Sequence, residues 1–74
     1  MKKVYIKTEY ITLGQLLKFV GIVGNGGETK AFLAQNVVKI NGEPDNRRGK
    51  KLFNGDIVTV LEFEFAVLAK NTVE

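Results

Sequence analysis

The spacing of hydrophobic residues changes near residue 36, and this change constrains the fold more than any other feature of the sequence. Before it, hydrophobic side chains recur at helical intervals, at Leu13, Leu16, Leu17 and Val20. After it, Val38 and Ile40 alternate with Lys39 and Asn41, which is the spacing of a half-buried strand. A chain that is helical first and extended later is typical of the α+β class, in which helices gather on one face of a sheet.

Polar residues predict where the two helices begin and end. Thr12 can cap a first turn, and Gln15, three residues later, can reach back to complete a capping box. Asn25 can cap a second helix, in which Glu28 occupies a favourable position in the first turn. We expect this second helix to end with Asn36 in the left-handed conformation.

Turn residues divide the rest of the chain into short strands. A strand is expected over residues 4–9, ahead of the helices. Asn41-Gly42 is a strong signal for a two-residue hairpin turn, and Pro44 limits the returning strand to an edge. A second turn is expected at residues 54–56.

One long strand is expected to follow, from Ile57 to about Leu68. Glu62 and Glu64 should face water, and the odd positions should face the core. These odd positions are Ile57, Leu61, Phe63, Phe65 and Val67. The resulting fold has two short helices packed on a small antiparallel sheet, and residues 70–74 are expected to form a frayed tail.

Length and composition restrict the chemistry. A chain of 74 residues has room for one domain, expected to span residues 1–74 with its core motif at about 12–60. It contains no cysteine, histidine or serine, so the usual general bases, nucleophiles and metal ligands are missing. The glycines between residues 21 and 27 lack the spacing of a nucleotide-binding loop. We therefore expect no catalysis, no metal, no cofactor and no small-molecule substrate.

The N-terminal segment predicts the compartment. It is positively charged but is not followed by the apolar stretch of a signal peptide, and no run is long enough to cross a bilayer. We expect a cytoplasmic protein with no membrane partner.

Positive charge is concentrated in one segment. The formal net charge is +3, and Arg47, Arg48, Lys50 and Lys51 contribute +4, so the other residues together carry −1. A local basic patch is typical of a site for a polyanion, although a run of charges is also common on an ordinary solvated loop. Lys18, Lys30 and Lys39 belong to separate predicted elements, and we expect them to converge with this loop on one rim.

The aromatic residues divide into two groups. Phe32, Phe63 and Phe65 are expected in the core, whereas Phe19 and Phe53 are candidates for exposure. The pattern does not support an aromatic sheet face for stacking RNA bases.

Several of these motifs together resemble a known family. The strings T-L-G-Q-L-L-K, V-K-I-N-G-E, N-R-R-G-K-K-L and G-D-I-V look like the ribosomal protein S4-type RNA-binding domain, in particular its small single-domain YaaA/YbcJ-like group. Many members carry a basic residue where this chain has Thr12, and a Ser-Arg pair where it has Asn25-Gly26. The resemblance implies RNA binding, with ribosomal RNA or the ribosome as the usual partner.

The leading hypothesis is non-catalytic binding of structured RNA by a monomer. The expected RNA-binding residues are Arg47, Arg48, Lys50, Lys51, Lys30, Lys18, Lys39 and Asn41, the last of which mainly shapes the hairpin. The alternative is a protein-interaction module that docks on a ribosomal or RNA-processing protein through the edge of the C-terminal strand. Binding to duplex DNA is a third possibility, because charge alone does not separate the two polymers.

Overall fold

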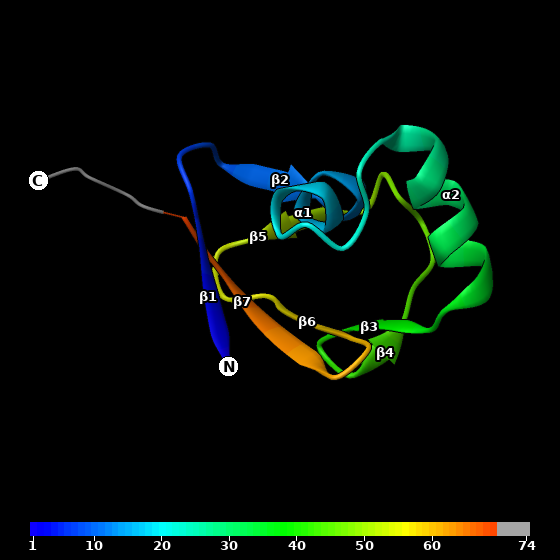
Figure 1. The fold of residues 1–74 in the computed structure, drawn as a ribbon. Coiled ribbons are helices and arrows are strands. Elements are labelled where there is room, and N and C mark those ends of the chain that lie inside the picture. Colours follow the sequence, from blue (N-terminus) through cyan, green and yellow to red (C-terminus); the bar gives the residue numbers. More distant parts are fainter. Residues whose placement is uncertain (70–74) are drawn as a thin grey trace, which may run out of the picture.

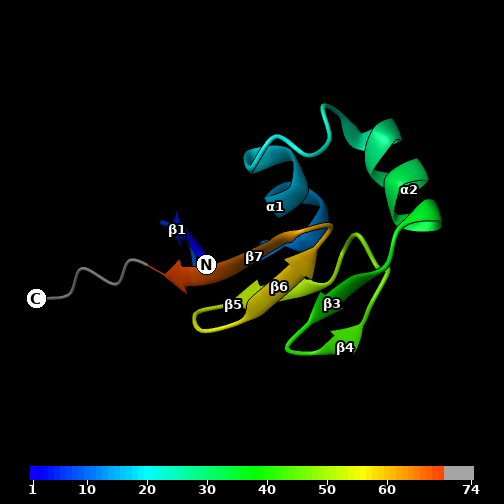
Figure 2. The same cartoon turned by 60° about the horizontal axis from the view of Figure 1, so that its bottom comes forward.

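The two expected helices lie on one side of a five-stranded sheet (Figures 1 and 2). A computed structural model describes residues 1–69, so the expected tail at 70–74 lies outside the described residues. In chain order the elements are β1 (Lys2–Ile6), β2 (Tyr10–Thr12), α1 (Leu13–Phe19), α2 (Gly26–Gln35), β3 (Val38–Ile40), β4 (Glu43–Pro44), β5 (Lys51–Phe53), β6 (Ile57–Val60) and β7 (Phe63–Ala69). The α+β class is confirmed.

Both predicted helix starts are confirmed. The Thr12 hydroxyl accepts a hydrogen bond from the Gln15 amide at 3.2 Å, and the Gln15 side chain accepts one from the Thr12 amide at 2.9 Å. These reciprocal bonds form the capping box of α1. At α2, the Asn25 side chain accepts a hydrogen bond from the Glu28 amide at 3.0 Å.

The predicted end of α2 is correct in position but wrong in conformation. Asn36 follows the last helical residue but has φ −132°, which is extended rather than left-handed. Its backbone amide and its side-chain amide both donate to the Phe32 carbonyl, at 2.9 and 3.0 Å. Because this carbonyl is already satisfied, the helix needs no left-handed turn to finish.

The sheet is mixed rather than purely antiparallel. Its strand order is β1-β7-β6-β3-β4, and β1 runs parallel to β7 while the other pairs are antiparallel. The expected strand at 4–9 lies earlier, at Lys2–Ile6. A separate ribbon, which the sequence did not predict, is formed by β2 and β5. It joins the start of α1 to the segment after the basic loop.

The single long strand expected over 57–68 is wrong, because the chain reverses at Leu61. Leu61 has φ +55°, and Val60 pairs with Phe63 across the turn. Because of this reversal, the buried side of β6 is the one that carries Val58. Leu61 and Phe63 are left exposed, at 55% and 41%. Phe65 is buried, as expected.

The hairpin turn at Asn41-Gly42 is confirmed. Both residues have positive φ, +53° and +87°, and Ile40 pairs with Glu43 on either side of them. Positive φ at both central residues is the requirement of the turn type that Asn-Gly favours.

The core lies between the helices and the sheet. Its largest fully buried hydrophobic side chains come from α1, β3, β5, β6 and β7, and include Leu13, Leu16, Leu17, Leu52 and Val67. Within residues 1–69, neither helix combines the length and apolarity that a membrane span requires.

Candidate functional site

The basic loop is fixed to the first turn of α1 by backbone hydrogen bonds. The Leu13 amide donates to the Lys50 carbonyl and the Gly14 amide to the Arg48 carbonyl, both at 2.9 Å. Amides in the first turn of a helix have no partner within the helix, so the loop carbonyls satisfy two of them. Figure 1 shows the segment between β4 and β5 passing beside both helices.

Gly14 allows this close approach. A Cβ atom at this position would lie 3.3 Å from the Arg48 carbonyl oxygen and 3.4 Å from the Arg48 Cβ. Side chains at such distances require the neighbouring atoms to move. This role of Gly14 was not predicted, because its partner is distant along the chain.

Arg48 lies where two surface grooves meet. One groove is lined by Thr12, Lys18 and Gly26 together with Arg48, and the other by Lys30 and Asn46 together with Arg48. None of the described residues lining either groove is acidic. We call these two adjoining grooves the basic groove. It brings together Lys18 from α1, Lys30 from α2 and Arg48 from the loop.

Arg47 points its guanidinium at Asp45. Its Nε and Nη2 atoms donate to the two carboxylate oxygens at 3.0 and 2.7 Å, and its backbone amide also donates to Asp45 at 3.0 Å. These hydrogen bonds lower the pKa of the Asp45 carboxyl to about 2. The forked donor face expected to bind phosphate is therefore occupied by an acidic neighbour.

Lys50 and Lys51 continue from the loop into β5. Lys50 is partly buried and its charge contributes to the lowered pKa of Asp45. Lys51 is exposed, and its Nζ atom lies 4.8 Å from the centroid of the Tyr10 ring. The side chain of Lys51 thus extends the positive surface onto the β2–β5 ribbon.

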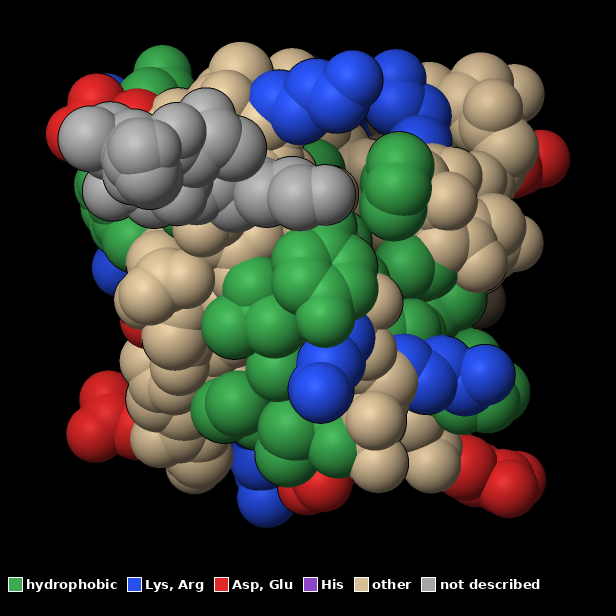
Figure 3. Space-filling view, turned by 90° about the vertical axis from the view of Figure 1, so that its left-hand side faces the viewer, with side chains coloured by type: hydrophobic (Ala, Val, Ile, Leu, Met, Phe, Trp, Pro, Cys, Tyr) green, Lys and Arg blue, Asp and Glu red, His purple; other side chains and the backbone are tan. Residues whose placement is uncertain are grey.

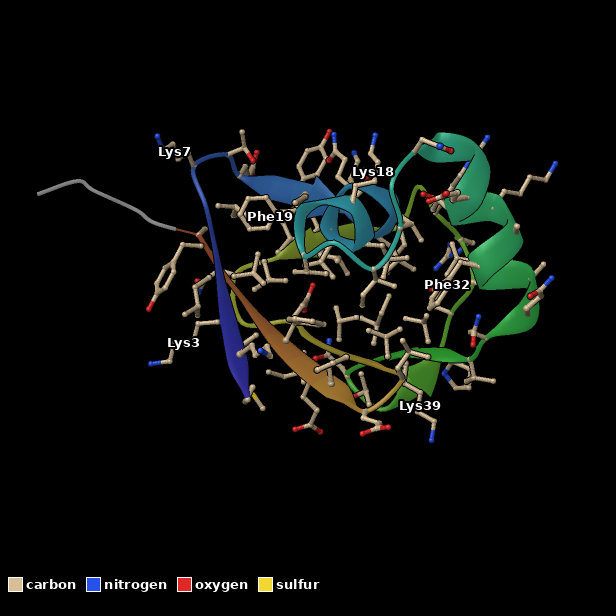
Figure 4. The ribbon with its side chains drawn as sticks, viewed as in Figure 1. Lys3, Lys7, Lys18, Phe19, Phe32 and Lys39 are labelled. Atoms are coloured by element: carbon tan, nitrogen blue, oxygen red, sulfur yellow. The ribbon has the colours of Figure 1, made fainter. Side chains whose placement is uncertain are left out.

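Of the eight expected residues, three line the basic groove; the other five are Arg47, Lys50, Lys51, Lys39 and Asn41. Lys39 is exposed between the buried side chains of β3, and it points away from the sheet on the side opposite Lys18 (Figure 4). Alternation along a strand explains this, because Val38 and Ile40 face the helices.

Asn41 is occupied by contacts inside the protein. Its Nδ2 donates to the Asp56 carboxylate at 3.1 Å, and its Oδ1 accepts from the Ile57 amide at 2.9 Å. The side chain therefore joins the β3–β4 turn to the start of β6, which fits the shaping role expected for it.

Within residues 1–69 there is no group of three or more acidic, histidine or cysteine side chains that could hold a metal ion. The chemistry of the basic groove is that of anion binding by arginine, lysine and backbone amides.

Two helices beside a β-hairpin, with a basic loop fixed to the first helix, define an S4-type domain. The S4 domain family model matches residues 4–68, and the chain belongs to this family. The chain is also similar to the probable ribosome maturation protein RlbA of Bacillus subtilis (strain 168). The two are 52% identical over 58 residues, which cover 78% of this chain and 82% of the relative.

Proposed function

We propose that this protein binds structured RNA through the basic groove and does not catalyse a reaction. The observation that carries the proposal is the convergence of Lys18, Lys30 and Arg48 from three separate segments onto adjoining grooves. A guanidinium can donate two parallel hydrogen bonds to a phosphate, and lysines act as point charges beside it.

The kind of RNA is suggested by the comparisons. Membership in the S4 domain family supports RNA as the partner, and the relative's name, a ribosome maturation protein, supports ribosomal RNA or a ribosome-associated particle. We further propose that the domain acts in the cytoplasm as a monomer.

Recognition is proposed to depend on shape. The deep groove of A-form RNA is too narrow for side chains to read, so a small basic surface follows the positions of the phosphates instead. Lys50 and Lys51 extend this surface. Arg47 has a smaller part because Asp45 holds its donors. Lys39 is left out because it points to the opposite side of the sheet, and Asn41 because its side chain is bonded within the protein.

A salt titration with a labelled RNA stem-loop tests the proposal. If the basic groove neutralises about three phosphates, the logarithm of affinity should fall with the logarithm of salt with a slope of roughly −2 to −3. Arg48→Ala should weaken binding about tenfold and make the slope shallower by about one.

Lys39→Ala is the matched control, since it removes the same charge from the other side of the sheet. It should change affinity by no more than about twofold. Equal losses from the two variants would exclude the basic groove as the site. Competition by duplex DNA of the same sequence decides between the two polymers. If the DNA displaces the labelled RNA as well as unlabelled RNA does, the protein binds duplexes in general rather than RNA specifically.

A second candidate function, docking on another protein, is favoured by the exposed side of β1. The edge expected to accept a partner strand was that of the C-terminal strand, but β7 lies between β1 and β6 and both of its edges are paired. Among residues 1–69 the free edge on this side belongs to β1. Figure 3 shows a band of hydrophobic side chains here, with lysines among them.

We call this surface the β1 face. Its exposed aromatic residues are Tyr5 (55%), Phe19 (67%) and Phe63 (41%). Phe19 and Phe63 line one groove together with Lys2 and Lys3. These lysines favour an extended segment of a ribosomal or RNA-processing protein in which apolar and acidic residues alternate. They disfavour a second copy of β1, because lysines would then face lysines.

Calorimetry with a synthetic peptide of alternating valine and glutamate tests this second function. Binding of the peptide should persist after the protein has been treated with RNase. It should be abolished by Phe19→Glu and unchanged by Arg48→Ala. No binding by the peptide, or binding indifferent to Phe19→Glu, rejects docking at the β1 face.

A further inference from the structure

An exposed aromatic pair lies next to the basic groove, on the β2–β5 ribbon. Tyr10 stands directly opposite Phe53 in the antiparallel register. The ring centroids are 5.7 Å apart and the rings are tilted by 50°. Tyr10 is 37% exposed and Phe53 is 43% exposed. Large aromatic side chains on the surface of so small a domain are candidates for contact with a ligand.

The ribbon has two faces with different surroundings. Leu52, between Lys51 and Phe53 in sequence, is fully buried against the core. Because side chains alternate along a strand, Tyr10 and Phe53 share the outward face with the next pair, Thr12 and Lys51. The two pairs are about 7 Å apart along the ribbon.

This outward face is continuous with the basic groove. Thr12 lines the basic groove with Lys18 and Arg48, and its cross-strand partner is Lys51. The Nζ atom of Lys51 lies over the ring of Tyr10, at 4.8 Å from its centroid. An ammonium at this distance is attracted to the ring electrons, so Lys51 links the charged and the aromatic parts of the surface.

We propose that Tyr10 and Phe53 form a stacking site for an unpaired base of RNA whose phosphates lie in the basic groove. This inference rests on the proposed function and specifies its ligand: a duplex stem followed by at least one unpaired nucleotide. The base stacks on the aromatic pair, since every base has a π face. Lys51 leaves the Tyr10 ring and binds the adjoining phosphate.

Two labelled RNAs test the inference: a blunt-ended stem-loop, and the same stem-loop with an unpaired uridine at one end or the other. The protein should bind one of the extended RNAs about tenfold more tightly than the blunt RNA. An abasic nucleotide in place of the uridine keeps the phosphate but removes the base, and it should abolish this gain.

Variants of Tyr10 separate stacking from a structural role. Tyr10→Leu should remove the preference for the extended RNA and leave affinity for the blunt RNA unchanged, whereas Tyr10→Phe, which keeps the ring, should retain the preference. A thermal melt by circular dichroism establishes that both variants are folded. If Tyr10→Leu is unfolded, Phe53→Leu replaces it with the same expectation.

Tyrosine fluorescence measures stacking on Tyr10 directly. The chain has two tyrosines and no tryptophan, so in a Tyr5→Phe variant Tyr10 is the remaining tyrosine. Its emission should be quenched by the extended RNA and not by the abasic form. Equal binding of blunt and extended RNAs, with no quenching, overturns the stacking site while leaving the proposed function intact. Failure of both RNAs to bind at all would overturn the proposed function itself.

Discussion

The basic groove and the β1 face adjoin at the end of α1 but are built in different ways. Lys18 lines the basic groove and Phe19, the next residue, lines the β1 face (Figure 4). Successive residues on a helix point about 100° apart, so one short helix serves both surfaces. The basic groove depends on backbone hydrogen bonds that fix a loop, whereas the β1 face depends on a strand edge. The two surfaces are thus built from different elements, and each should respond to different perturbations.

The largest expected contrast comes from charge reversal on each surface. Lys18→Glu with Arg48→Glu should lower affinity for the RNA stem-loop by more than about a hundredfold, because phosphates then meet carboxylates. Lys2→Glu with Lys3→Glu changes the net charge by the same amount and should cost less than about threefold. Fluorescence anisotropy at one salt concentration measures both. Similar losses would mean that overall charge, rather than the basic groove, determines binding.

The second contrast concerns the fixing of the loop. Gly14→Val would place methyl groups against the Arg48 backbone, which a Cβ atom alone would already approach to 3.3 Å. The strain should lower the free energy of unfolding by about 1–3 kcal/mol and displace Arg48. We expect RNA affinity to fall about tenfold. Denaturant unfolding measures the free energy of unfolding, and fluorescence anisotropy measures the RNA affinity. Unchanged affinity would show that the position of the loop does not affect RNA binding.

The third contrast concerns Asp45, which holds the donors of Arg47. Asp45→Asn removes a negative charge beside the loop and releases the guanidinium, so RNA affinity should rise about threefold. Fluorescence anisotropy of the labelled RNA stem-loop, titrated with protein, measures this affinity. A loss of affinity would mean that the ion pair positions the loop rather than competing with phosphate.

The same pair has a pH signature. The Asp45 carboxyl has a pKa of about 2 instead of 3.8, because Arg47 donates hydrogen bonds to the ionised form. A pKa that is lower in the folded state stabilises the fold above about pH 4, and this stabilisation is lost as pH falls towards 2. Carboxyl carbon shifts measured by NMR should show the midpoint near pH 2, and Asp45→Asn should remove the corresponding acid dependence of stability.

The smallest expected effect lies outside both surfaces. Leu61 has φ +55°, a conformation that a leucine adopts at a cost and that asparagine tolerates. Leu61→Asn should raise the free energy of unfolding by about 0.5 kcal/mol and leave RNA affinity unchanged. A chemical denaturation curve tests this, and lower stability would mean that Leu61 makes a contact that offsets the strained backbone.

Local signals explain what the sequence predicted well. Thr12 with Gln15, and Asn25 with Glu28, define helix starts within four residues of chain, and Asn41-Gly42 defines its own turn. Lys18 and Lys30 lie on helices whose starts follow from these local signals, whereas the position of Arg48 depends on hydrogen bonds between the loop and the first turn of α1.

The features that were missed depend on partners far along the chain or on loop conformation. The parallel pairing of β1 with β7 leaves no mark on either strand alone. Apolar and acidic residues alternate from Leu61 to Phe65, and this strand-like pattern concealed the turn between β6 and β7. Arg47 and Asp45 meet through the conformation of the loop, which neither residue type predicts.

The pairing of β1 with β7 also determines when the sheet can form. Lys2 pairs with Phe65 and Ile6 with Ala69, so β1 can form these hydrogen bonds only after residues 63–69 have been synthesised. Pairings of this sequence separation close late, because a long loop must be ordered first. Completion of the sheet therefore waits for residues 63–69, although both helices precede them in the chain.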